Sequence, residues 1–289
     1  MKKGALFFFL GCMALGYLAS RVGVYSLNDK FLLSHITLKN SPSTTSLVNE
    51  ELPKTLSRPF FYLDQGSQMY AFKSEDGEYV LKLIKQHRLA FFKIPSSHLL
   101  ASFLQEIQRE KEEEKLNKRL RLYESCKIAW NELRNECGLV YLGICPKHNI
   151  PIPLTLYDKL GRKHTLLLDS TEFILQKKGE LIAPTLNKLI SKGDIEGAKK
   201  RLDQLFSLLL LRCQKGIFDS DAFISKNAGF IEDRAIYLDL GGFSKNGRMQ
   251  NPRIYILEIE KISSKLRLWL NGQNQELANY STDLINQLQ

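Results

Sequence analysis

The sequence lacks the signatures of a metal-binding or disulfide-built protein. None of its five cysteines belongs to a Cys-x-x-Cys pair or stands beside a histidine at ligand spacing. A dedicated cysteine or histidine metal site is therefore not expected. The pattern is typical of small buried thiols in a reduced protein, and a disulfide between two of the last four cysteines stays open. The cysteines are Cys12, Cys126, Cys137, Cys145 and Cys213.

Arginine-rich runs interleaved with aromatic residues are also missing, as are helix-turn-helix and zinc-finger spacings. We therefore expect no nucleic-acid partner. The net charge of +10 is spread along the chain and suits a nucleotide or an anionic lipid surface. With 44% hydrophobic and 25% charged residues, the composition excludes disorder and a multi-span membrane protein. The length permits one large domain or two small lobes.

Positions 4–20 form an uncharged, largely apolar run between Lys3 and Arg21. A helix rises about 1.5 Å per residue and must cross about 30 Å of hydrocarbon, so this run lies between a signal-peptide core and a full span. We favour an uncleaved single-pass anchor over residues 1–21, and a signal peptide cleaved after Gly16 is the alternative. Flanking charges do not fix the side of the membrane, which would be cytosolic if ATP is used.

Residues 22–57 contain a Ser, Thr and Pro-rich stretch and are expected to form a loosely structured stem. The body that follows begins with short apolar runs that predict a three-stranded meander over 60–84, and residues 97–136 then predict a long helix. Further strands are expected at 139–144, 152–157 and 164–176, helices at 184–191, 194–215 and within 252–288, and a hairpin over 230–238. This order predicts an α+β fold with a sheet-rich lobe over 58–177 and a helical lobe over 178–289.

The most informative stretch is a predicted hairpin with polar residues at both ends. Asn227 lies before it, and the tripeptide Asp239-Leu-Gly241 ends it. Because the hairpin folds the chain back, Asn227 and Asp239 are expected to approach one another. Two hard oxygen ligands of this kind suit Mg²⁺ together with nucleotide phosphates. Asp219 and Asp221 precede Asn227 in a loop, where aspartates are also common turn formers.

These elements and motifs resemble a divergent member of the protein-kinase-like superfamily over about residues 60–245. The resemblance implies ATP and Mg²⁺ as cofactors, with Asn227 and Asp239 as metal ligands. It implies that Asp221 is the base that accepts the proton of the attacking hydroxyl, with Asp219 in reserve. The implied fold has two lobes, a small antiparallel-sheet N-lobe and a reduced helical C-lobe, preceded by the membrane segment.

The same resemblance gives roles to residues upstream. Gly66 stands in place of the glycine-rich loop over the phosphates, and Lys82, in the third strand, would bind the phosphates. Its partner on the long helix would be Glu124 or Glu132. Backbone groups around Gln176 would read the adenine.

Several departures from the kinase pattern keep three functions open. Gly66 is the one glycine of the loop that is retained, no His-Arg precedes Asp221, and no Ala-Pro-Glu follows Gly241. The first function is a membrane-anchored kinase that transfers phosphate to a hydroxyl. The second is a pseudokinase that binds a nucleotide or a protein partner without catalysis. The third is a structural protein at a membrane without a nucleotide.

Overall fold

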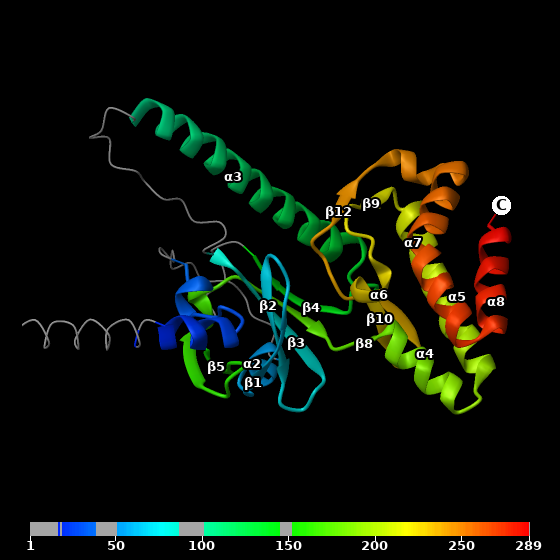
Figure 1. The fold of residues 1–289 in the computed structure, drawn as a ribbon, viewed down its shortest axis with the longest axis horizontal. Helices are drawn as coiled ribbons and strands as arrows, with labels where there is room; N and C mark the ends of the chain where they lie inside the picture. Colours follow the sequence, from blue (N-terminus) through cyan, green and yellow to red (C-terminus); the bar gives the residue numbers. More distant parts are fainter. Residues whose placement is uncertain (1–16, 18, 39–50, 87–100, 145–151, 289) are drawn as a thin grey trace, which may run out of the picture. The chain divides into compact units, whose positions relative to one another are not determined.

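Figure 1 shows the computed structural model, which describes residues 17, 19–38, 51–86, 101–144 and 152–288. The chain is α+β, as the sequence predicted. It divides into two compact units. The first comprises residues 1–88 and 145–173, and the second comprises residues 89–144 and 174–289. Each unit is therefore assembled from two separate segments of the chain.

The predicted meander forms the centre of the first unit. Strands β1 (Phe60–Gln65), β2 (Met69–Ser74) and β3 (Tyr79–Ile84) pair antiparallel in sequence order. The turn between β2 and β3 needs a glycine, because Gly77 has a φ of +76°. The prediction of a three-stranded meander is confirmed.

The sheet of the first unit is mixed, so the prediction of an antiparallel sheet was wrong. Strand β5 (Pro153–Tyr157) runs parallel to β1, and β6 (Lys163–Leu167) pairs antiparallel with β5, giving the order β3-β2-β1-β5-β6. Parallel neighbours cannot be joined by a tight hairpin, and the long chain between the end of β1 and the start of β5 permits this pairing. The rings of Phe61 and Tyr157 stack across this pair with centroids 4.9 Å apart.

A single strand predicted over 164–176 is two strands separated by a turn. The strand β6 is followed by η3 (Leu168–Ser170) and then by β7 (Phe173–Lys177). The Ser170 hydroxyl donates to the carbonyl of Leu167 at 2.6 Å, which favours the turn over an extended backbone.

Part of the predicted stem packs into the first unit. Residues 19–27 are helical, and Phe31 and Ile36, on either side of η1 (Leu33–His35), are buried. The Phe31 ring meets the rings of Tyr70 and Phe72 edge-on, at 5.1 and 5.4 Å. The short helix α2 (Glu51–Leu56) ends in the buried Leu56. These apolar residues contribute to the core of the unit.

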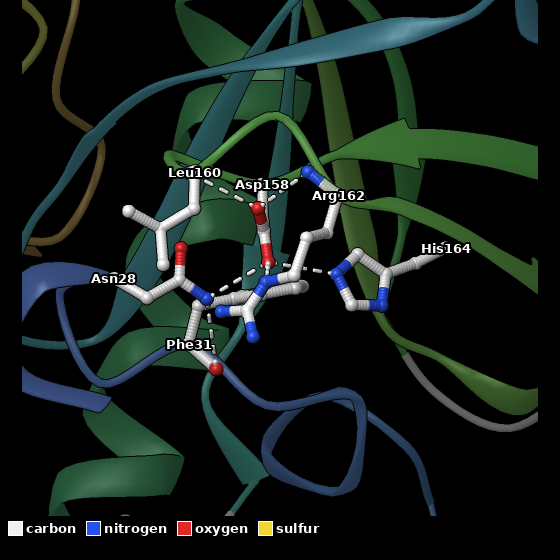
Figure 2. A network of polar contacts seen from close by, with 6 residues as sticks. All are labelled: Asn28, Phe31, Asp158, Leu160, Arg162 and His164. Carbon is white, nitrogen blue, oxygen red and sulfur yellow. Dashed lines mark hydrogen bonds and ion pairs between the residues drawn. The ribbon is translucent and has the colours of Figure 1, made fainter. Parts of the chain in front are cut away.

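Asp158 holds this N-terminal segment to the β5–β6 turn (Figure 2). Its carboxylate accepts hydrogen bonds from the side-chain amide of Asn28 at 2.9 Å and from Arg162 Nε at 3.1 Å. The backbone N–H groups of Leu160 and Arg162 donate to Oδ1, and His164 Nε2 lies 2.9 Å from Oδ2, the oxygen that accepts from Asn28 and Arg162 Nε. The side chain of Asp158 is fully buried, and this network satisfies it.

The membrane segment predicted at 4–20 lies almost wholly outside the described residues. Tyr17, Ala19 and Ser20 are the positions of it that are described. Among the residues that the structure describes, no helix is long and apolar enough to cross a membrane.

The second unit contains the long helix and most of the other helices. The helix α3 (Ala101–Glu132) packs on β4 (Leu139–Gly143) and on β12 (Phe243–Lys245), and it belongs to this unit rather than to the sheet-rich one. After β8 (Glu180–Leu181) come α4 (Ile182–Ser191) and α5 (Ile195–Gln214), close to their predicted bounds. Asp194 caps α5 by accepting the N–H of Gly197 at 2.9 Å. Cys126, Cys137 and Cys213 are buried.

Short strands and two final helices complete the second unit. The chain runs through β9 (Ile217–Asp219), α6 (Ile224–Asn227), β10 (Ala228–Ile231), β11 (Arg234–Tyr237), β12 and η4 (Gly247–Gln250). The strand order is β11-β10-β8 in one sheet and β12-β9 in the other. The helices α7 (Pro252–Gln273) and α8 (Gln275–Asn286) are capped by Asn251 and Asn274. The predicted hairpin and the predicted break near residue 271 are confirmed to within a few residues.

Candidate functional site

Pairing of β9 with β12 brings two distant loops together in the second unit. Asp219 at the end of β9 lies opposite Phe243. The N–H of Ser220 donates to the carbonyl of Gly242 at 3.0 Å. The loop that carries Asp221 is therefore fixed beside the chain that follows Asp239-Leu-Gly241.

Asp219 is buried within this junction and is 7% exposed. Its Oδ1 accepts the N–H of Asp221 at 3.0 Å, and a Cβ on Gly242 would lie 2.2 Å from the same oxygen. Burial raises the pKa of the Asp219 carboxyl, and the charge of Arg212 offsets only part of this effect. The position and hydrogen bond of Asp219 are those of a residue that shapes the loop.

Arg212 on α5 lies beneath the loop and is fully buried. Its Nη1 donates to the carbonyl of Ile217 at 3.4 Å, at the start of β9. Nearby Tyr237 is also buried, and its hydroxyl donates to the carbonyl of Leu208 at 3.3 Å. Arg212 therefore provides a positive charge under the acidic loop.

Asn227 joins the loop to the end of the hairpin. Its side-chain Nδ2 donates to the carbonyl of Asp221 at 2.6 Å. Its own carbonyl accepts the N–H of Leu238 at 2.7 Å and that of Asp239 at 3.4 Å. The predicted approach of Asn227 to Asp239 is thus present in the backbone, across the β10–β11 hairpin.

Asp239 is exposed, and its carboxylate shapes the tripeptide that it begins. Oδ1 accepts the N–H of Leu240 at 2.7 Å and that of Gly241 at 3.1 Å. Within the described part of the chain, no hydrogen bond or ion pair occupies Oδ2. Asp221 is likewise exposed, so two carboxylates and the amide of Asn227 lie at the surface of one loop cluster.

Sequence reasoning missed Ser125, which ties the long helix to this cluster. The Ser125 hydroxyl is fully buried, donates to the carbonyl of Leu240 and accepts the N–H of Phe243 at 2.7 Å. A serine in a helix gives no sequence signal of such a contact, because its partners are more than a hundred residues away. Ser125 holds both ends of the short segment that follows Asp239.

Gly66 and Lys82 belong to the first unit. The N–H of Gly66 donates to the carbonyl of Met69 at 2.9 Å, and its carbonyl accepts Lys85 Nζ at 2.8 Å. Gly66 has no positive φ, and nothing lies within 4 Å of a Cβ placed on it. Lys82 pairs with Ala71 across the sheet and is half-buried between apolar neighbours, as the period of the strand predicted.

The remaining predicted residues lie in the second unit and have structural partners or face solvent. Glu132 forms an ion pair with Lys245, and Glu124 is exposed on α3. The buried side chain of Gln176 donates to the carbonyls of Cys137 and Tyr237, at 2.7 and 3.3 Å. Gln176 therefore links β7 to its neighbours.

Among the described residues, no three His, Cys, Asp or Glu side chains are grouped so that they could hold a metal ion. The metal ligands that the sequence predicted at the loop cluster are one carboxylate and one amide, those of Asp239 and Asn227. Mg²⁺ commonly takes few protein ligands and keeps positions for phosphate oxygens and water.

Comparison with known proteins gives low-level structural similarity. No protein-family model matches the chain, and a search of curated proteins finds no match. One similar structure is that of WbdD, with a TM-score of 0.38, 13% identity and coverage of 78% of this chain and 45% of that one. Another, described as the bifunctional kinase-methyltransferase WbdD, has a TM-score of 0.34 and 15% identity, covering 76% and 42%.

A third similar structure is the Rv3197–erythromycin complex from Mycobacterium tuberculosis, with a TM-score of 0.33 and 14% identity, covering 67% of this chain and 48% of that one. The chain thus spans less than half the length of the structures that it matches. A kinase-like interpretation of this chain depends on its own element order and loop geometry.

Proposed function

We propose that this chain is a kinase-like protein whose second unit holds a Mg²⁺–nucleotide complex at Asn227 and Asp239. The observation that carries the proposal is the hydrogen bonding of Asn227, which contacts the backbone of Asp221 on one side and that of Asp239 on the other. Three residues of the kinase-like pattern are thereby assembled within one unit.

The donor atoms suit Mg²⁺. Because Asn227 uses Nδ2 to bind the Asp221 carbonyl, its Oδ1 is the atom left for a cation. Asp239 uses Oδ1 for two backbone N–H groups, which leaves Oδ2. Bound Mg²⁺ would neutralise charge on the nucleotide phosphates.

Asp221 is the proposed base and Asp219 is not. An exposed carboxylate next to Asn227 can accept the proton of an acceptor hydroxyl. Asp219 is buried, and its oxygen already holds the Asp221 N–H, so it positions the loop. A membrane location through residues 4–20 is part of the proposal and places the body at a lipid surface.

A pseudokinase is the second candidate, and the β1–β2 turn favours it. In this turn the N–H of Gly66 is bonded to Met69, and Lys85 occupies its carbonyl. A turn bonded in this way offers little backbone to nucleotide phosphates. Nucleotide binding without transfer would fit that turn and the absence of His-Arg before Asp221.

Thermal unfolding with Mg²⁺ and ATP tests the proposal. The full chain is expected to gain stability with millimolar Mg-ATP, because a ligand that binds the folded state shifts the unfolding midpoint upward. Asp239→Ala should abolish the shift, and Asp283→Ala, an exposed aspartate on α8, should retain it. No shift for the unaltered chain would contradict the proposal. A shift without phosphate transfer, unchanged in Asp221→Ala, would favour the pseudokinase.

A further inference from the structure

Two lysines flank one aromatic ring in the loop that follows Asp221. Phe223 is half-buried, and its ring centroid lies 4.6 Å from Lys265 Nζ and 5.8 Å from Lys226 Nζ. Lys226 comes from α6, and Lys265 comes from α7. The ring therefore draws two ammonium groups from separate helices to one place.

The backbone fixes this group beside Asp221. The N–H of Phe223 donates to the carbonyl of Asp221 at 2.8 Å, and the N–H of Lys226 donates to the carbonyl of Phe223 at 3.0 Å. The Asn227 side chain binds the same Asp221 carbonyl. Phe223 is thus held by the short turn that also carries the proposed base.

Neither of these two lysines is paired with a carboxylate in the described part of the chain, unlike several other basic residues of the second unit. Lys199, Arg201, Lys245 and Arg267 are each paired with a carboxylate. Within residues 109–144 and 152–288, neither Lys226 nor Lys265 has such a pair. Two cations without counter-ions, brought together by a ring, provide a place for an anionic group.

From this arrangement we infer that the acceptor is a hydroxyl compound that carries a phosphate monoester, held by Lys226 and Lys265. This inference rests on the proposed function and specifies its substrate class. The acceptor hydroxyl gives its proton to the Asp221 carboxylate while its oxygen bonds to the γ-phosphorus. The bond from that phosphorus to the β–γ bridging oxygen breaks, which leaves a second phosphate ester and ADP.

Ligand-observed NMR with glycerol 3-phosphate, and with glycerol at equal ionic strength, tests the inference on the full chain in one detergent. Glycerol 3-phosphate should give saturation-transfer signals, and glycerol should give none. The double variant Lys226→Ala, Lys265→Ala should bind at least roughly tenfold more weakly, since two charge-assisted contacts are lost. Lys226→Arg, Lys265→Arg should retain binding, as should Lys200→Ala, an exposed lysine on α5.

Competition with vesicles distinguishes a lipid headgroup from a soluble compound as the source of this phosphate. Displacement of the signal by phosphatidylcholine vesicles that contain lysophosphatidic acid, a lipid with a phosphate monoester and a free hydroxyl, but not by phosphatidylcholine vesicles alone, identifies a lipid headgroup. No displacement identifies a soluble phosphate. Equal binding by the chain and its double Ala variant would overturn the inference, as would equal signals from glycerol. The Mg-ATP thermal shift, measured on the same samples, distinguishes failure of this inference from failure of the proposed function. A retained shift with no glycerol 3-phosphate binding removes only the acceptor site.

Discussion

The carboxylates of Asp158 and Asp239 occupy contrasting polar clusters in the two units. Asp158 is fully buried and receives donors from the N-terminal segment, from the β5–β6 turn and from β6 (Figure 2). Asp239 is exposed and receives two backbone N–H groups on a single oxygen. A carboxylate whose oxygens are filled by the protein has a structural role. One with an oxygen left open at the surface can bind a ligand.

Removing the Asp158 carboxylate, the acceptor of the buried hydrogen bonds, should cause the largest loss of stability. Asp158→Ala leaves the buried Asn28 amide, the exposed Arg162 side chain and two backbone N–H groups without their acceptor. We expect the free energy of unfolding to fall by about 2–4 kcal/mol, measured by urea denaturation. Glu78→Ala, at an exposed glutamate, should stay within about 0.5 kcal/mol of the unaltered chain. A small loss for Asp158→Ala would show that the cluster is not structural.

A smaller loss of stability is expected at Gly242, which packs tightly against the loop of Asp219 and Asp221. Gly242→Ala places a methyl group 2.2 Å from Asp219 Oδ1 and 3.1 Å from the Asp221 backbone nitrogen. Overpacking of this kind costs about 1–3 kcal/mol and should also weaken the Mg-ATP thermal shift, because the loop moves. Gly247→Ala is the matched control, since nothing lies within 4 Å of its added carbon. Equal stability and equal nucleotide response for the two variants would contradict the close packing.

The smallest expected effect is on the pH dependence of the free energy of unfolding, to which Asp158 and Asp219 contribute with opposite signs. Burial alone raises the pKa of Asp158, but hydrogen bonds from His164, the Arg162 N–H and Asn28, with the charge of Arg162, lower it overall. Its stabilisation is therefore present above the unfolded pKa of about 3.9 and is lost as the pH falls through the folded pKa.

Asp219 has a raised pKa, and its contribution has the opposite sign. It is present below the unfolded pKa and is lost as the pH rises through the folded pKa. On acidification from pH 7 to pH 3, Asp158→Asn should therefore lose less of its free energy of unfolding than the unaltered chain does. Asp219→Asn should gain free energy of unfolding, relative to the unaltered chain, as the pH rises toward 7. Parallel curves for the two variants would contradict these assignments.

Local patterns in the sequence predicted much of the fold. Alternating apolar residues predicted β1 to β3, and the spacing of leucines on 194–215 predicted α5. The parallel pairing of β5 with β1 could not be predicted, because strand order depends on contacts between distant segments. The burial of Phe31 and Ile36 could not be predicted either. The stem that contains them looks polar in sequence, and their contacts are with distant segments.

The candidate site was predicted in part. The hairpin between Asn227 and Asp239 indicated that they approach each other, because a hairpin is a local structure. Asp219 is buried and Asp221 is exposed, and two aspartates two positions apart give no sequence signal of this difference. Ser125, Lys265 and Gly242 come from other elements, so their contacts with the loop depend on tertiary packing.

Electron paramagnetic resonance of Mn²⁺, used in place of Mg²⁺, tests most directly whether the open cluster binds a metal–nucleotide complex. With ATP present, the full chain should bind Mn²⁺ at a single site. Asp239→Ala should lose this binding, and Asp158→Asn should keep it at temperatures where it is folded. Bound Mn²⁺ that is unaffected by Asp239→Ala, or no bound Mn²⁺ with ATP, would contradict the assignment of the Asn227–Asp239 cluster as the nucleotide–metal site.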